Sequence, residues 1–211
     1  FEVVVSDDGS SDPNVGLVAE SYQVKFVTRP HDYRGAIPTR NMPAVLNAGV
    51  AASTGAVIQT LQQDHILAPD FGLWLARCWS DQYVMFGLTC RRDRDFTTPD
   101  LDAMLANLHY PDGEVRWKDN FSEGRNCLIE FNDWRHTDGL DAAVARDHWR
   151  DVDTHYTGSG HMWLDHMLTL RMAGARFVIN PFMRLYHVEH PGRDTGNWQQ
   201  EMKVSDRYFK K

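Results

Sequence analysis

The sequence lacks a long apolar segment, a cysteine framework and an excess of positive charge. No apolar run approaches the roughly 20 residues that span a bilayer, so we expect no membrane span in this chain. The 3 cysteines lie far apart without a CxxC spacing, which disfavours both a disulfide framework and a cysteine zinc site. The net charge of -7 gives no general electrostatic reason to bind nucleic acid.

The sequence also lacks an initiating Met, a signal peptide and a glycine-rich phosphate loop with a lysine. We therefore expect a piece of a longer protein that is cytoplasmic and reaches a membrane only through parts outside this chain. The missing phosphate loop disfavours a nucleotidyltransferase of similar architecture. With 211 residues, 42 % hydrophobic and 24 % charged, the chain fits a single globular domain.

Strand and helix patterns alternate in residues 1–65, which predicts an α/β fold with a mixed, mostly parallel sheet flanked by helices. We expect this part to be the nucleotide-binding half. Residues 29–38 contain prolines and charges without periodicity and are predicted to be a loop. The predicted elements are an opening strand to Val5, a helix over Leu17–Tyr22, a strand over Val24–Val27, a helix over Met42–Ser53 capped by Thr54-Gly55, and a strand over Ala56–Leu61.

The pattern continues more irregularly through residues 66–190, which we expect to bind the acceptor, and residues 191–211 form a polar C-terminal segment. Residues 91–141 show little periodicity, but their aromatic content argues against disorder and favours a functional segment. The predicted elements are a helix over Pro69–Ser80, a strand over Tyr83–Leu88, order again at Ala142–Trp149, a helix over Met162–Met172 closed by Ala173-Gly174, and a strand over Ala175–Ile179 ended by Asn180-Pro181.

Acidic side chains follow two of the predicted strands directly. Asp7 and Asp8 come at the end of the opening run, and Asp64 with His65 follows the strand ending at Leu61. Ligands of open α/β sheets bind outside the carboxyl ends of the strands. The two junctions therefore predict a site for a polar, phosphorylated ligand with a divalent cation beside the second acid.

Several motifs in order resemble those of family 2 glycosyltransferases of the GT-A fold. VVVSDDGSSD at residues 3–12 resembles the family's VDDGSxD turn, and residues 47–58 match its N-x-G-x-x-x-A-x-G-x-x-I pattern. Leu61 to Asp64 falls where the family has L-D-x-D, and residues 158–165 resemble its glycine-rich turn and E-D pair. Residues 186–192, YHVEHPG, resemble a segment of the chondroitin and hyaluronan type enzymes.

The resemblance implies an inverting hexosyltransferase that moves a sugar from a UDP- or GDP-sugar to a carbohydrate acceptor, in polysaccharide biosynthesis, with Mn²⁺ or Mg²⁺. It implies Asp165 as the general base and Asp64 and His187 as metal ligands. The acceptor candidates are Trp163, His161, Trp117 and Trp134. The nucleotide-sugar candidates are Asp7, Asp8, Gly9, Ser10, Arg40, Asn47, Gln63 and Arg193.

Several of these candidates also fit a structural role. Asp7 and Asp8 fit a turn or helix cap, and His187 a residue that binds no metal. Arg193 fits a solvated surface arginine. Asp165 fits an N-terminal helix acid, a position that favours the charged form of the carboxyl. Trp163 and His161 fit packing residues equally well.

The chain departs from the family pattern at three places. The first acid of D-x-D is Gln62 here, and the glutamate of the E-D pair is Leu164. These changes make a catalytically impaired domain that binds a nucleotide-sugar or a glycan the main alternative. The third departure is the absence of the family's first strand and helix, so we expect about 40 to 90 further N-terminal residues in the natural protein.

Overall fold

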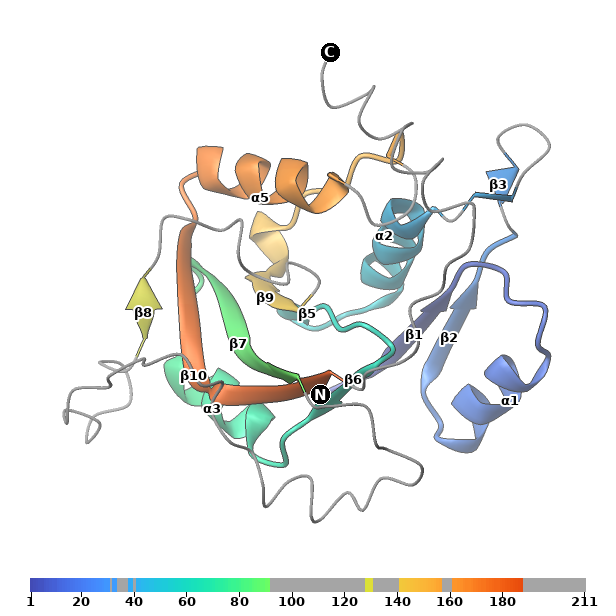
Figure 1. The fold of residues 1–211 in the computed structure, drawn as a ribbon, viewed down its shortest axis with the longest axis horizontal. Helices are drawn as coiled ribbons and strands as arrows, with labels where there is room; N and C mark the ends of the chain where they lie inside the picture. Colours follow the sequence, from blue (N-terminus) through green and yellow to red (C-terminus); the bar gives the residue numbers. More distant parts are fainter. Residues whose placement is uncertain are drawn as a thin grey trace. The chain divides into compact units, whose positions relative to one another are not determined.

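The structure, a computed structural model, describes residues 1–30, 32–33, 38–39, 41–91, 128–130, 141–156 and 161–187. These residues divide into two compact units, which we describe one at a time (Figure 1). Unit 1 comprises the described residues within 1–58 and 146–173, and unit 2 those within 59–145 and 174–187. Within the described ranges, no helix is both long enough and apolar enough to cross a membrane.

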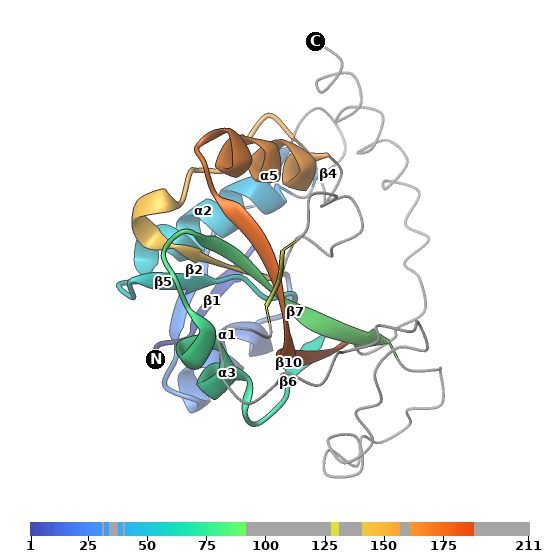
Figure 2. The same ribbon diagram turned by 90° about the vertical axis from the view of Figure 1, so that its left-hand side faces the viewer.

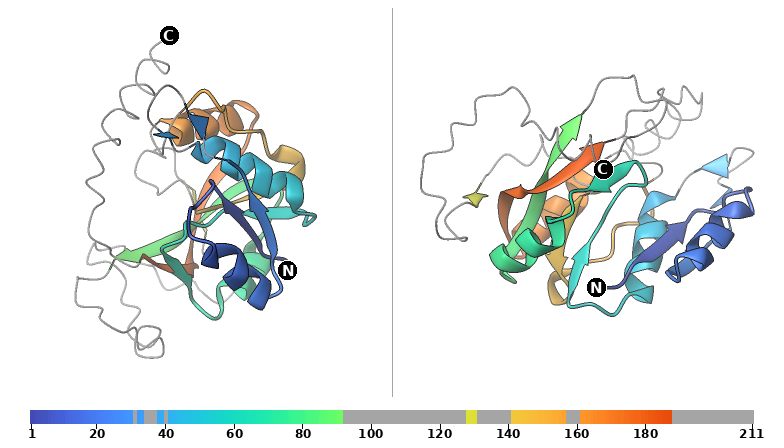
Figure 3. Two further views of the ribbon diagram at one scale, coloured as in Figure 1. Left: turned by 90° about the vertical axis from the view of Figure 1, so that its right-hand side faces the viewer. Right: turned by 90° about the horizontal axis from the view of Figure 1, so that it is seen from below.

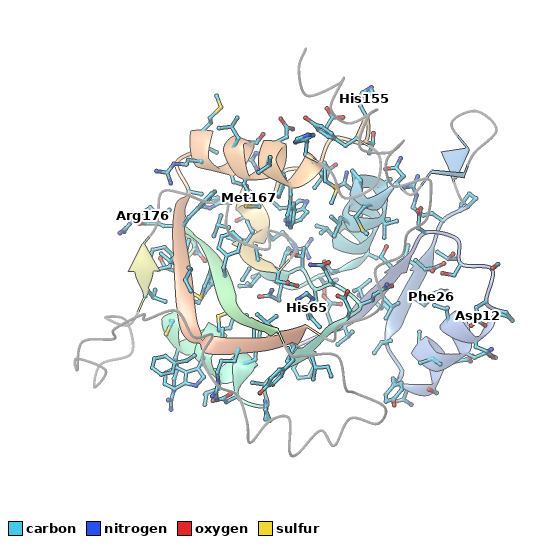
Figure 4. The ribbon with its side chains drawn as sticks, in the orientation of Figure 1. Asp12, Phe26, His65, His155, Met167 and Arg176 are labelled. Carbon is cyan, nitrogen blue, oxygen red and sulfur yellow. The ribbon has the colours of Figure 1, made fainter. Side chains whose placement is uncertain are left out.

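Unit 1 begins with the predicted strand, helix and strand: β1 (Val4–Asp7), α1 (Asn14–Ser21) and β2 (Lys25–Thr28). The two strands pair in parallel, with Asp7 opposite Thr28 at their carboxyl ends (Figure 3). Gly16 lets α1 approach β2 closely, since a Cβ at this position would lie 3.4 Å from the ring of Phe26, which is labelled in Figure 4. β1 therefore ends at the first of the two acids singled out in the sequence.

A short hairpin follows β2. β3 (Asp32–Tyr33) and β4 (Pro38–Thr39) pair in antiparallel fashion, so the prediction of a plain loop over residues 29–38 was wrong for Asp32, Tyr33 and Pro38. Strands of two residues are too short to show the period-2 alternation by which strands are recognised in a sequence.

α2 (Met42–Ala52) confirms the predicted helix within one residue. Its N-terminus is capped by Asn41, whose Oδ1 accepts a hydrogen bond from the Ala44 N–H at 3.1 Å. Gly49 allows the helix to approach β1, since a Cβ there would lie 3.2 Å from that of Ser6. The Ser6 hydroxyl also donates to the carbonyl of Val45 at 2.7 Å. α2 is thus fixed against the strand that carries the first acidic turn.

The sequence predicted that Thr54-Gly55 caps the C-terminus of α2, and this prediction was wrong. Ala52 is the last helical residue, Ser53 after it is extended, and Gly55 is not one of the residues with positive φ. Instead, the guanidinium of Arg146 donates to the carbonyls of Gly55 at 2.6 Å and Val50 at 3.2 Å. A side-chain donor from a distant part of the chain therefore satisfies the end of this helix.

The rest of unit 1 is a 3₁₀ turn (Arg146–His148) and α5 (Met162–Met172). α5 has the predicted bounds, and it buries Met162, Met167 and Leu170 almost completely. The chain leaves the helix through Gly174, whose φ of 92° is the left-handed conformation expected of a glycine that ends a helix.

Unit 2 is built around two long parallel strands, β7 (Tyr83–Arg91) and β10 (Arg176–His187), which run side by side in Figure 2. The strand order of the sheet is β5-β9-β7-β10-β6, with β8 also paired to β10. The other elements are β6 (His65–Leu67), α3 (Phe71–Cys78), β8 (Ile129–Glu130) and β9 (Ala142–Ala145). Only the last residue of β5 (Val57–Gln59) belongs to unit 2.

The mixed α/β class is confirmed, but the sheet is less parallel than predicted. β10 pairs in parallel with β7 and antiparallel with both β6 and β8, and β7 pairs antiparallel with β9. The apolar centre of the sheet is formed by five side chains that are 0 % exposed, Val84, Met85, Ala143, Phe177 and Leu185. α3 covers β10, where Trp74 stacks on Phe182 with ring centroids 4.3 Å apart.

The sequence predicted that this strand ends at Asn180-Pro181, and this prediction was wrong. β10 continues to His187 across a register shift between Asn180 and Arg184. At that shift a proline, which lacks an N–H, is tolerated. Gly87 on β7 faces the same irregularity, because a Cβ there would overlap the Leu185 side chain and the Met183 carbonyl. The longer strand matters because its end carries His187.

Candidate functional site

The turn after β1 is held by Asp7 itself. Its Oδ2 accepts hydrogen bonds from the N–H groups of Gly9 at 3.0 Å and Ser10 at 2.9 Å, and from the Thr28 hydroxyl at 3.0 Å. Burial raises the pKa of this carboxyl, but the hydrogen bonds from Ser10, Thr28 and Gly9 outweigh it and hold the pKa below its ordinary 3.8. Gly9 has a φ of 74°, which suits a glycine in this turn. Asp7 therefore serves as a turn cap, and its contact with a nucleotide stays a prediction.

Asp8 connects the same turn to α2. Its Oδ2 accepts a hydrogen bond from the backbone N–H of Asn41, the capping residue of that helix, at 3.0 Å. The neighbouring Arg40, another nucleotide candidate, lies outside the described residues. The structure thus anchors Asp8 beside a helix N-terminus, a place where backbone N–H groups favour anionic ligands.

Asn47 on α2 has a structural task. Its Nδ2 donates to the carbonyl of Val152 at 2.8 Å, and its Oδ1 accepts from the N–H of the same residue at 2.9 Å. This two-point contact fixes the segment that leads toward α5. A nucleotide contact by Asn47 stays a prediction, and we do not include this residue in the proposed site.

Asp165 lies in the first turn of α5. Burial raises the pKa of its carboxyl above the ordinary 3.8, and the charge of Asp153 raises it further. Desolvation and the like charge thus act against the charged form, which the helix N-terminus was expected to favour. A carboxylate with a raised pKa is a stronger base, so the geometry remains suited to accepting a proton.

The two acceptor candidates next to Asp165 are positioned differently. Trp163 is 9 % exposed and stacks on His166 with ring centroids 5.4 Å apart. This arrangement agrees with the alternative that Trp163 is a packing residue. Trp149 lies on the same imidazole at 4.8 Å. His161 precedes the helix with a φ of 31°, a strained conformation for a residue other than glycine. Acceptor binding by either candidate stays a prediction.

In unit 2, the second acidic junction forms a tight turn in which the N–H of His65 donates to the carbonyl of Gln62 at 3.2 Å. Gln63 at its tip is exposed, and the Asp64 side chain is 15 % exposed. The side chain of His65 is fully buried behind the turn. Its Nδ1 lies 3.2 Å from Asp64 Oδ1 and its Nε2 lies 3.2 Å from Asp141 Oδ2.

Sequence reasoning gave no role to His65 or Asp141. A single histidine after a D-x-D-like motif has no distinguishing spacing, and Asp141 is far away in the sequence. The one available signal was that Asp141 directly precedes the apolar run of β9, the place where an acid meets a strand end.

The candidate metal ligands approach each other through β6 and β10. These strands pair antiparallel, with His187 opposite His65, the residue that follows Asp64. Directly opposite residues of an antiparallel pair have Cα atoms about 4.5–5.5 Å apart. Within the described part of the chain, no three metal-binding side chains form a cluster. The side chain of His187 and all of Trp117, Trp134 and Arg193 lie outside the described residues.

No protein-family model matches the chain, and no curated protein matches it. Solved structures do. GalNAc-T7 with UDP, GalNAc and Mn²⁺ aligns with 90 % of this chain and 38 % of its own, at TM-score 0.60 and 11 % identity. S. aureus TarS 1-349 aligns with 100 % of this chain and 63 % of its own, at TM-score 0.55 and 11 % identity.

A third match comes from Mycobacterium tuberculosis. Glucosyl-3-phosphoglycerate synthase, in complex with Mn²⁺, UDP-glucose and glycerol 3-phosphate, aligns with 98 % of this chain and 66 % of its own, at TM-score 0.52 and 15 % identity. The chain has a GT-A-like fold. It spans between 38 % and 66 % of the length of these three structures. At such identities the likeness shows the fold and leaves the activity open.

Proposed function

We propose that the chain is the catalytic part of a family 2 type glycosyltransferase that transfers a sugar from a UDP- or GDP-sugar to a carbohydrate hydroxyl with inversion. The observation that carries the proposal is the pairing of β6 with β10. It sets His187, the last residue of β10, opposite His65, the residue directly after Asp64. Three GT-A-like structures of similar fold, two of them containing UDP or UDP-glucose together with Mn²⁺, support the same assignment.

The donor set fits a divalent cation. Asp64 offers a carboxylate oxygen and His187 an imidazole, and Mn²⁺ accepts both types of ligand. Gln62, in place of a carboxylate, lowers the negative charge near the cation and favours weaker binding. When bound, the cation would neutralise the diphosphate of the donor and make it a better leaving group.

The nucleoside end of the donor is assigned to the turn after β1. Asp7 holds this turn in shape, while Asp8 and the exposed Ser10 lie beyond the end of the strand. Carboxylate and hydroxyl oxygens accept hydrogen bonds from a base N–H or a ribose hydroxyl.

Asp165 is the proposed general base. Its carboxylate takes the proton of the acceptor hydroxyl as that oxygen attacks the anomeric carbon from the face opposite the diphosphate. The raised pKa of Asp165 favours proton transfer in this direction. One carboxylate is sufficient for an inverting transfer.

The test is release of nucleoside diphosphate from UDP-glucose, UDP-N-acetylgalactosamine and GDP-mannose, with and without Mn²⁺. We expect release from at least one donor that requires Mn²⁺ and falls in Asp165→Asn, which keeps its nucleotide affinity. If nucleotide binds with Mn²⁺ but no donor is cleaved, even with carbohydrate acceptors added, the impaired binding domain replaces this proposal. Gln62 and Leu164 are the residues that favour that second candidate.

A further inference from the structure

His65 is an ionisable residue that is buried inside unit 2 and to which the sequence analysis gave no role. It is the first residue of β6, its side chain is fully buried, and Figure 4 labels it in the interior. Both ring nitrogens face carboxylates, with N···O distances of 3.2 Å to Asp64 and 3.2 Å to Asp141. The imidazole thus lies between two carboxylates, and the three side chains form a polar row within unit 2. Because His65 and Asp141 are buried, close packing limits how far either side chain can turn.

Asp141 fixes the inner end of this row. The side chain is 2 % exposed, and its Oδ1 accepts a hydrogen bond from the Gln62 N–H at 3.2 Å, while Oδ2 faces His65. One buried carboxylate thus accepts a hydrogen bond from the start of the acidic turn and also lies against the imidazole behind it. The row joins residues that precede β6 and β9, two strands of the same sheet.

Asp64 is the outer end of the row. Its Oδ1 is the atom that faces His65 and is buried, while the side chain as a whole is 15 % exposed. The imidazole therefore lies against one oxygen of this carboxylate from the buried side.

We propose that His65, packed between Asp141 and Asp64, is a positioning residue that holds the Asp64 carboxylate for the divalent cation. This inference rests on the proposed function, because it assumes that Asp64 binds the cation. Residues that orient a metal ligand from behind typically contribute 10–100-fold to metal affinity. His65 also pairs in register with His187 on β10, the second candidate ligand, so it neighbours both candidates.

The test is a Mn²⁺ titration of the full chain at constant pH, followed by the electron paramagnetic resonance signal of free Mn²⁺. We expect Asp64→Ala to abolish binding, and His65→Leu to weaken it about 10–100-fold. His65→Gln keeps an amide donor and is expected to lie between His65→Leu and the wild type. Asp141→Asn is expected to weaken Mn²⁺ binding less than His65→Leu, and it serves if the leucine variant does not fold.

A matched control comes from the exposed pair of His155 and Asp153, whose Nδ1 and Oδ1 atoms lie 2.7 Å apart. His155→Leu should leave Mn²⁺ affinity unchanged. If folded His65 and Asp141 variants bind Mn²⁺ like the wild type while Asp64→Ala does not, the positioning role is wrong and the metal site stands. If Asp64→Ala also binds Mn²⁺ like the wild type, the metal assignment of the proposed function is wrong, and the positioning role is wrong with it.

Discussion

Acidic side chains in the molecule are held in two contrasting ways. In unit 1, Glu2 accepts hydrogen bonds from Lys25 and from Thr54 and Gly55, Asp7 accepts them from Ser10, Thr28 and Gly9, and the pKa of each is lowered. Asp165, in the same unit, has a raised pKa because it is partly buried and faces Asp153. In unit 2, Asp64 contacts a buried imidazole rather than backbone donors.

This contrast separates acids that stabilise the fold from acids that are available for chemistry. A carboxylate satisfied by several N–H groups is stabilised as an anion and is a poor base. A carboxylate with a raised pKa, or one oriented from behind by another side chain, retains its capacity for a proton or a cation. Motif matching alone treats all of these acids alike, so each side of the contrast needs its own test.

The largest expected effect is that of Asp64→Ala on transfer. Loss of the cation removes several kcal/mol of leaving-group stabilisation, which corresponds to a loss of about 10³-fold or more in rate. The measurement is initial-rate nucleotide release at saturating Mn²⁺. Asp81→Asn, which changes an exposed acid that accepts from Trp79 at 2.9 Å in the same unit, should keep full activity. Equal activity of Asp64→Ala and the wild type would contradict the account.

The next effect is that of Asp165→Asn, which is expected to lower the turnover rate about 10²–10⁴-fold by removing the base. Because the pKa of Asp165 is raised, its ionised form costs the fold free energy, so the free energy of unfolding at pH 7 should not fall. Turnover and urea unfolding measure the two parts. A variant that is both active and less stable would place Asp165 among the acids that hold the fold.

The third prediction concerns His166, whose pKa is lowered by burial to about 4 from the ordinary 6.5. Between these values the unfolded chain binds a proton that the folded chain does not, so stability falls as pH falls from 6.5 toward 4. The loss is roughly 3 kcal/mol, at 1.4 kcal/mol for each pH unit. Urea unfolding at both pH values measures it. His166→Phe should lose this pH dependence, and an unchanged slope in that variant would contradict the assignment.

The smallest expected effect is that of Glu2→Gln. Lys25 holds the pKa of Glu2 at about 2, with help from hydrogen bonds donated by Thr54 and Gly55. Its stabilising effect is present above pH 4.5 and is lost as pH falls toward 2. Because Glu2 is exposed, we expect only a small decrease in Tm at pH 7 for Glu2→Gln, and none for the exposed control Glu20→Gln. Thermal unfolding at pH 7 and pH 3 checks both, and equal Tm values for the two variants would remove Glu2 from the fold-stabilising acids.

Much of the fold could be predicted because its signals are local. α2 was found from its apolar spacing, and the end of α5 from Gly174. β6 has only three residues and was missed, and β10 was cut short because Pro181 usually ends a strand. Local sequence does not show that a register shift accommodates the proline.

The candidate site was predictable only in part, because its contacts join distant segments. Asp64 and Asp165 were identified from motif order, while their surroundings were not. Asp153 raises the pKa of Asp165, and Asp141 reaches His65 from another strand. The roles of these partners depend on tertiary packing, which one sequence does not encode in any short pattern.

The central claim is that this GT-A-like chain binds a nucleotide through a cation at Asp64. Isothermal titration calorimetry with UDP and GDP, with and without Mn²⁺, tests it most directly. We predict that at least one nucleotide binds clearly more tightly with Mn²⁺, and that Asp64→Ala removes this difference. Equal affinity with and without Mn²⁺, or a Mn²⁺ dependence that survives in Asp64→Ala, would contradict the claim.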